Sequence, residues 1–213
     1  MFRRVLALGA HTDDVELGCG ATLARFVEEG AQVRVAAFSR AEQSLPEGFP
    51  PDALEQECYR SFDHLGLKDA VTVHRFPVRR FDEHRQDILE ELVGLNREFA
   101  PDLVLTMNSS DTHQDHKVVH EESVRAFRGC SVFGYEIPWN QSEHVIDTFW
   151  EVDDRHLKLK ARMLGEYATQ EVKGRSYMSD EFVYSAATFR GFQCRMTYAE
   201  AFETIRHHRR LDA

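Results

Sequence analysis

The sequence has few cysteines, no long apolar run and no excess of positive charge. Its four cysteines stand far apart and form no CxxC pair, so we expect no disulfide framework. We expect instead a reduced, cytoplasmic protein. No apolar stretch approaches the roughly 20 residues of a membrane span, which predicts no membrane insertion. The apolar stretch after Arg3 and Arg4 is shorter than the roughly 7–15 residues of a signal-peptide core, so no secretion signal is expected.

The charge balance excludes a second group of functions. The chain carries 26 Lys and Arg against 36 Asp and Glu, a formal net charge of −10 at pH 7. Nucleic acids and anionic membrane surfaces attract clustered cations, so neither is an expected partner. The glycines Gly9, Gly18 and Gly20 do not form the GxGxxG spacing, so a dinucleotide site is not expected.

The pattern of apolar residues predicts an α/β fold. Four short apolar runs, at residues 5–9, 33–38, 71–76 and 103–107, alternate with segments of helical period. Such runs are typical of parallel strands that are buried on both faces, so we expect helices packed on a mostly parallel central sheet. Further along, residues 131–138 predict another strand and residues 153–170 a helix. No repeat or linker divides the 213 residues, so we expect one domain over residues 1–213, with a homo-oligomer left open.

Two polar motifs follow two of the predicted strands. The first, AHTDD, brings His11, Asp13 and Asp14 directly after the run at 5–9, and the second, DTHQDHKVVH, spans residues 111–120. Each motif alone has a plain interpretation, the first as a helix N-cap and the second as a surface loop. Ligands of parallel sheets bind at the carboxyl ends of strands, so both motifs should meet at one rim, and together they favour a metal site.

The residue types fit a catalytic zinc site. Zinc accepts imidazole nitrogen and carboxylate oxygen, commonly from three protein ligands with one open position. His11, Asp14 and His116 supply a two-histidine, one-carboxylate set, which leaves Asp13 as general base for a metal-activated water. Such sites accept iron as well, so Fe²⁺ is an alternative to Zn²⁺. His120 lies four residues after His116, on the same helix face if a helix begins near residue 115, either as a partner behind the ligands or on the surface.

The two motifs together resemble those of the LmbE/PIG-L-type zinc-dependent N-deacetylases, which act on N-acetylglucosaminyl compounds. The resemblance is carried by AHTDDVELGCGATLARF and DTHQDH, and weaker similarity extends over most of the chain. It implies a Rossmann-like three-layer α/β sandwich and removal of an acetyl group from a sugar amine. By motif position, it implies the same three metal ligands and the same base as above.

The resemblance also assigns roles around the metal. His113 matches a histidine that supports the oxyanion or protonates the leaving amine, here expected as an imidazolium, and Asp115 would orient a histidine. The sequence departs from the usual motifs: Thr12 replaces a proline of AHPDD, Gln114 replaces that of HPDH, and Ala21 replaces a glycine. None of these changes removes a ligand or the base. Some members carry a tyrosine just before the second motif, where this chain has NSSDT.

The sequence says less about the substrate, which we expect to be a small N-acetylated sugar conjugate. Arg40, Arg79 and Arg80 are candidates to bind hydroxyls or an anionic aglycone, and Trp139, with Tyr135, is a candidate platform for a sugar ring. Each is equally consistent with an ordinary surface arginine or core aromatic. Two other classes of function remain: a metal-dependent phosphoesterase, which usually needs two metals, and a non-catalytic sugar or nucleotide binder of the same fold. The presence of both Asp13 and His113 speaks against a pure binder.

Overall fold

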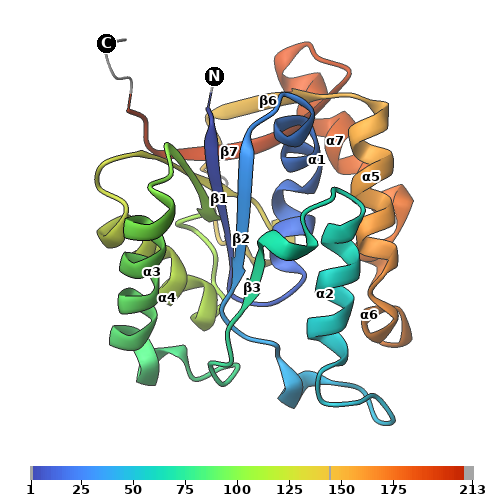
Figure 1. Ribbon diagram of the computed structural model, residues 1–213. Helices are drawn as coiled ribbons and strands as arrows, with labels where there is room; N and C mark the ends of the chain where they lie inside the picture. Colours follow the sequence, from blue (N-terminus) through green and yellow to red (C-terminus); the bar gives the residue numbers. More distant parts are fainter. Residues whose placement is uncertain (1, 144, 209–213) are drawn as a thin grey trace.

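The computed structural model describes residues 2–143 and 145–208, in which a seven-stranded sheet lies between two layers of helices (Figure 1). The strands are β1 (Arg4–Gly9), β2 (Gln32–Ala37), β3 (Val71–Val73), β4 (Leu103–Met107), β5 (Ser131–Tyr135), β6 (Thr148–Val152) and β7 (Tyr198–Arg206). Their order is β3-β2-β1-β4-β5-β7-β6. The first five strands are parallel, and β7 runs antiparallel to both β5 and β6. The mostly parallel α/β fold predicted from the sequence is therefore confirmed.

Helices cover both faces of the sheet. They are α1 (Asp14–Glu28), α2 (Ala53–Asp63), α3 (Arg85–Phe99), α4 (Gln114–Ala126), α5 (Asp154–Gly165), α6 (Ala168–Val172) and α7 (Asp180–Cys194). Short 3₁₀ turns are η1 (Glu42–Ser44), η2 (Lys68–Ala70), η3 (Phe81–His84), η4 (Pro138–Asn140) and η5 (Ser176–Met178). Figure 1 shows α3 and α4 on one face and α1, α2 and α5 on the other. Among the described residues, no helix is both long and apolar enough to cross a membrane.

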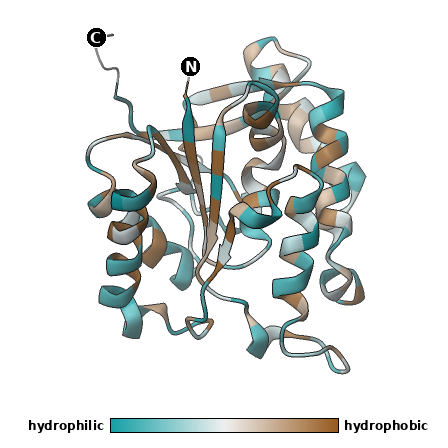
Figure 2. Ribbon diagram, viewed as in Figure 1, coloured by the Kyte–Doolittle hydropathy of each residue, from teal (hydrophilic) through white to brown (hydrophobic). Residues whose placement is uncertain are grey.

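The strand order creates the place where a site can form. From β1 the chain moves outward through β2 to β3, and it then returns to the other side of β1 to form β4. The connections after β1 and β4 therefore leave the sheet toward opposite faces (Figure 1), the arrangement beside which parallel sheets bind ligands. Both strands are buried throughout their apolar length, and Figure 2 shows the hydrophobic strands inside a more hydrophilic outer layer. The two strand ends are thus anchored in the buried core.

Two segments differ from the sequence-based expectation. The helix predicted over residues 153–170 is two helices, α5 and α6, because the backbone turns at Tyr167, whose side chain is buried under the first motif. The antiparallel strands β6 and β7 and the helix α7 carried no clear periodic signal. In α7, apolar side chains point both inward and outward: Val183 is buried, whereas Phe189 and Phe192 are exposed. A helix with apolar residues on both faces shows no amphipathic pattern.

Candidate metal centre

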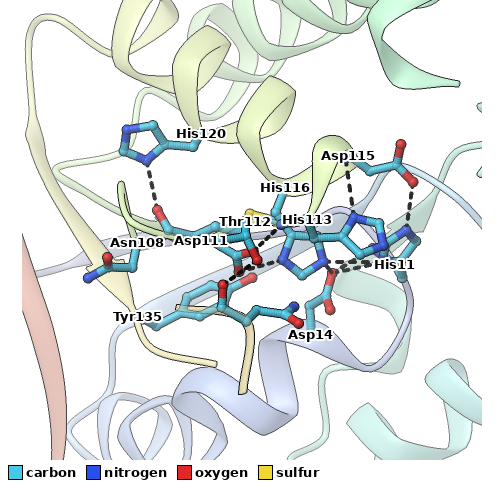
Figure 3. A network of polar contacts seen from close by, with 12 residues as sticks. His11, Asp14, Asn108, Asp111, Thr112, His113, Asp115, His116, His120 and Tyr135 are labelled. Atoms are coloured by element: carbon cyan, nitrogen blue, oxygen red, sulfur yellow. Dashed lines mark hydrogen bonds and ion pairs between the residues drawn. The ribbon is translucent and has the colours of Figure 1, made fainter. Parts of the chain in front are cut away.

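Both polar motifs meet at the carboxyl ends of β1 and β4, as the strand-end rule predicts. His11 follows β1 and Asp14 opens α1, while His116 lies in the first turn of α4, after β4 (Figure 3). His113 is the N-cap of α4, and its Nδ1 accepts the backbone N–H of Asp115 at 3.2 Å. This hydrogen bond fixes the start of α4, so that the second motif faces the first.

Three donor atoms form a nearly equilateral triangle. His116 Nε2 lies 3.3 Å from His11 Nδ1, and Asp14 Oδ2 lies 3.4 Å from each of these nitrogens. A tetrahedral zinc with bonds of about 2.0–2.1 Å holds neighbouring ligand atoms about 3.3–3.4 Å apart. The triangle therefore has the dimensions of one face of such a tetrahedron, and a fourth position stays open above it. The residues present fit the metal that the motifs imply.

The far nitrogen of each candidate histidine ligand is bound by a buried carboxylate. His11 Nε2 lies 3.0 Å from Asp115 Oδ2, and His116 Nδ1 lies 2.7 Å from Asp111 Oδ2. A carboxylate holds the imidazole proton on its own side, which leaves the lone pair of the other nitrogen facing the triangle. Asp115 is fixed in turn by the backbone N–H of Arg79 at 2.6 Å. The orienting role expected for Asp115 fits this geometry, whereas Asp111 was not assigned a role from the sequence.

The charges around the triangle favour the binding of a cation. Burial disfavours a charged His11, but Asp14 and Asp115 outweigh it and raise the pKa of His11 to about 10. Burial likewise works against the carboxylate of Asp14, yet His116 and His11 hold the pKa of Asp14 well below its usual range. The carboxylates therefore favour a positive charge at the triangle. A bound divalent ion would supply that charge, with neutral imidazoles as its ligands.

Asp13 and His113 flank the triangle without closing it. The side chain of Asp13 makes no capping hydrogen bond to α1, and burial together with the charge of Asp14 raises its pKa to about 6. Burial, with His116 and His11 nearby, lowers the pKa of His113 to about 4. The imidazolium expected at His113 is therefore replaced by a neutral ring. Its Nδ1 is an acceptor in the α4 cap, so its Nε2–H is the available donor.

The histidines alone also form a cluster. His11, His113 and His116 each offer a nitrogen, and these atoms lie within 4.8 Å of one another. The triangle with Asp14 is tighter, and His113 already uses one nitrogen in the cap. The geometry thus favours Asp14 over His113 as the third ligand.

A buried hydrogen-bond network holds the loop of the first motif from behind. The hydroxyl of Tyr167 lies at hydrogen-bond distance from both Thr12 O and Glu16 Oε1, and Glu16 also accepts from Ser61 at 2.7 Å. Within this network the Tyr167 hydroxyl donates to Glu16 Oε1 and to Thr12 O. Burial outweighs the contacts with Tyr167 and Ser61 and raises the pKa of Glu16 to about 8, so its carboxyl keeps a proton near neutral pH. Thr12, the substitute for the usual proline, offers its carbonyl to this network.

The three candidate arginines make contacts of their own. Arg40 is paired with Glu42 and lies near Glu55, and Arg80 is paired with Glu83. Arg79 acts through its backbone N–H, and its side chain is exposed. The structure thus gives each of the three arginines another partner or another role.

The two aromatic candidates separate clearly. Tyr135 is fully buried and donates to Leu8 O at 2.7 Å, so it is a core residue and the platform interpretation is wrong for it. Trp139 is 43% exposed and belongs to η4, which is fastened to the second motif because Thr112 N donates to Asn140 O at 2.8 Å.

Trp139 is backed by residues that sequence reasoning missed. The ring of Tyr177 stacks on Trp139 at 4.0 Å between centroids, and the guanidinium of Arg175 lies 5.6 Å over the Tyr177 ring. Burial and the nearby charge of Asp13 raise the pKa of Tyr177 to about 12, which connects this aromatic wall with the first motif. His120, in contrast, faces away and bonds Met107 O at 2.8 Å, where it ties α4 to the end of β4.

Comparison with known proteins agrees with this site. The sequence profile of the PIG-L family, described as GlcNAc-PI de-N-acetylase, matches residues 6–127, more than half of the chain and both motifs. The chain belongs to the PIG-L family. YaiS of Escherichia coli K12, described as an uncharacterized deacetylase, is 27% identical over 172 residues, which cover 76% of this chain and 89% of YaiS. This PIG-L protein thus belongs to a family of deacetylases.

A second relative has a named substrate. The 1D-myo-inositol 2-acetamido-2-deoxy-α-D-glucopyranoside deacetylase of Kineococcus radiotolerans is 29% identical over 184 residues. The alignment covers 64% of this PIG-L chain and 49% of that enzyme, so the chain spans about half of its relative's length.

Solved structures share the whole PIG-L fold. The N,N'-diacetylchitobiose deacetylase from Pyrococcus horikoshii superposes with a TM-score of 0.77 at 16% identity, over 96% of this chain and 84% of that one. GalB, a 4-carboxy-2-hydroxymuconate hydratase from Pseudomonas putida KT2440, superposes with a TM-score of 0.78 at 19% identity, over 99% of both chains. At these identities the likeness shows the fold alone. Because the fold also carries a hydratase, the reaction has to be argued from the site.

Asp111→Asn tests the orientation of His116. The amide cannot hold the imidazole proton as a carboxylate does, so Zn²⁺ affinity should fall by roughly 10- to 100-fold, the usual effect of removing such a partner. Titration of the metal-stripped protein against a chromogenic chelator measures it. Asp87→Asn, in the exposed first turn of α3, is the control. Wild-type affinity in Asp111→Asn would show that His116 needs no orienting carboxylate.

Glu16→Gln tests the buried proton. Between the ordinary pKa of a glutamate and about 8, the folded chain keeps a proton that the unfolded chain has released. Stability therefore falls as the pH rises through this window, by up to about 1.4 kcal/mol per pH unit. Glutamine carries no such proton, so the variant should gain stability relative to wild type between pH 5 and pH 8. Urea unfolding of both proteins in chelator measures the difference, and parallel curves would refute a protonated Glu16.

Proposed function

We propose that this protein is a zinc-dependent deacetylase of one domain, residues 1–213, that removes the acetyl group from the amine of an N-acetylglucosaminyl-type sugar. The observation that carries the proposal is the triangle of His11, Asp14 and His116, with its open fourth position and Asp13 beside it. The curated relatives support the substrate class, because one of them is named for a 2-acetamido sugar. The same donors fit Fe²⁺, so metal analysis of the purified protein decides between the two ions.

His11, Asp14 and His116 would hold the metal. A zinc ion in this position would polarise the amide carbonyl and lower the pKa of a water to about 7. The protein's own groups supply the proton transfers. Asp13 takes a proton from the attacking water, and its raised pKa lets it return that proton to the leaving amine near neutral pH.

His113 stabilises the developing charge on the acetyl oxygen. Its Nε2–H is free to donate because its Nδ1 is an acceptor in the α4 cap. A neutral donor in a buried site adds an oriented hydrogen bond without adding a charge that the metal would repel. His113 thereby takes the role of oxyanion support, and proton delivery to the amine falls to Asp13.

Trp139 provides the surface on which a sugar ring would lie. Its indole is partly exposed at the rim, and the stacked Tyr177 prevents it from turning away. The apolar face of a pyranose packs against such a ring, while the acetamido group reaches the metal triangle. The fastening of η4 to Thr112 sets the distance between the platform and the second motif.

Asp13→Ala tests the general base. Deacetylation of N-acetylglucosamine conjugates should slow by roughly 10²–10⁴-fold in kcat, the usual size of an acid–base contribution, while one metal ion per chain is retained. Amine release measures the rate, and elemental analysis measures the metal. Asp52→Ala is a matched control, since Asp52 occupies the same N-cap position on α2 and also makes no capping hydrogen bond. Near-normal activity with metal bound would rule out this role, and two metal ions per chain would favour a phosphoesterase.

Trp139→Ala tests the platform. Loss of the aromatic face should raise KM by about tenfold, a difference of roughly 1.4 kcal/mol, and leave kcat nearly unchanged because the indole lies outside the reacting centre. Initial rates over a range of sugar concentrations separate the two constants. Phe192→Ala removes an exposed aromatic of α7 and should change neither. An unchanged KM in Trp139→Ala would remove Trp139 from the binding site.

A further inference from the structure

The helix that carries the first motif is interrupted. In α1, Cys19 has φ −147° and ψ 22°, far from helical values, so the turn from Asp14 to Gly18 is offset from the rest of the helix. A regular helix would join Leu17 O to the N–H of Ala21. Both residues are buried at the interruption, where an unpaired backbone group would be costly.

An ion pair occupies the place of that helical hydrogen bond. The ammonium of Lys160, on α5, donates to Leu17 O at 2.7 Å and to Glu200 Oε1 at 2.6 Å. Glu200, on β7, accepts the N–H of Ala21 at 3.3 Å and that of Thr22 at 2.7 Å. The chain of contacts runs from the acceptor through the two side chains to the donor. Lys160 and Glu200, which we call the α1 staple, therefore satisfy both sides of the break.

Packing against the first turn of α1 is tight on one side and open on another. A Cβ on Gly18 would lie 2.1 Å from the ring of Tyr135, so the turn rests directly on that ring. Elsewhere Leu17 and Gly18 border a cavity of about 350 Å³ whose apolar wall comes mainly from α7, with Lys160 and Glu200 also at its surface. Side-chain packing alone cannot hold the turn against a cavity, so the hydrogen bonds of the staple have to.

We propose that Lys160 and Glu200 are positioning residues of the metal centre. The staple fixes the offset between the two parts of α1 and thereby sets the place of Asp13 and Asp14 opposite His116. Both residues lie outside residues 6–127, the part matched by the family profile, and neither touches the donor triangle. The inference rests on the proposed function for the roles of Asp13 and Asp14, and on the structure alone for the placement of the turn.

The test is a neutral replacement of the staple, Lys160→Met with Glu200→Gln. It leaves no buried charge unpaired, and buried ion pairs are often replaceable without loss of stability. It does remove the donor to Leu17 O. A matched control exists in Arg190→Met with Glu136→Gln, a pair of similar burial on the same cavity in which Arg190 donates to Glu136 and to Gln193 rather than to α1. Thermal unfolding verifies that both variants are folded at the assay temperature.

Amide hydrogen exchange of the metal-stripped protein is the first measurement. Residues 14–18 should exchange at least tenfold faster in the staple variant than in the control, while residues 23–28 exchange as in wild type. Zn²⁺ affinity, measured with the metal alone, should fall by about 10- to 100-fold, as for other groups that orient metal ligands. In the loaded enzyme, kcat should fall and KM should stay nearly constant.

Each of the other possible results would contradict one part of the proposal. Unchanged exchange at residues 14–18, or an equal loss of Zn²⁺ affinity in both variants, would reduce the staple to an ordinary contribution to stability. If the double variant does not fold, Glu200→Gln alone must shift the exchange in the same direction, and an unchanged protein would overturn the proposal. A wild-type protein that binds no Zn²⁺ would end the proposed function but leave the exchange result to decide on the staple.

Discussion

Two imidazoles and two adjacent carboxylates are crowded together at the carboxyl end of β1, and the surrounding structure serves to hold them there. In the absence of compensation, two neighbouring aspartates repel each other and burial penalises their charge. The protein compensates with oriented histidines, and each histidine is fixed by a further buried carboxylate. The result is a set of donor atoms whose spacing fits a small divalent cation better than it fits hydrogen bonds among the side chains themselves.

The N-terminal and C-terminal parts of the chain contribute differently to this site. The parallel strands β1 and β4 bring the two motifs together at the point where the chain reverses direction across the sheet. The later elements, α5 to β7, support the motifs from outside. Tyr167 binds the carbonyl of Thr12, and the staple of Lys160 and Glu200 holds the first turn of α1. A chain cut after α4 would keep both motifs and lose these supports.

Trp139 shows that the proposed substrate platform and the proposed catalytic groups lie on different parts of the fold. The proposed reacting groups lie just after the buried strands β1 and β4, at the starts of α1 and α4. The platform sits on a short turn that follows β5, joined to the second motif by backbone hydrogen bonds. Such turns can change in sequence without disturbing the sheet, and this allows one fold to carry more than one activity.

Sequence alone determined the parallel part of the sheet, the rim where the site lies and the residue types of the metal centre, because each depends on local pattern. An apolar run followed by His11, Asp13 and Asp14 is visible within the ten residues 5–14. Tertiary structure decided what depends on how helices, strands and loops are placed in space. Asp111 could be assigned to His116 only once α4 was placed, and Tyr135 proved to be a core residue because β5 lies inside the sheet. Lys160 and Glu200 gave no signal, since their partner is a helix break more than 130 residues away, and no periodicity in a sequence records which backbone groups a distant side chain will satisfy.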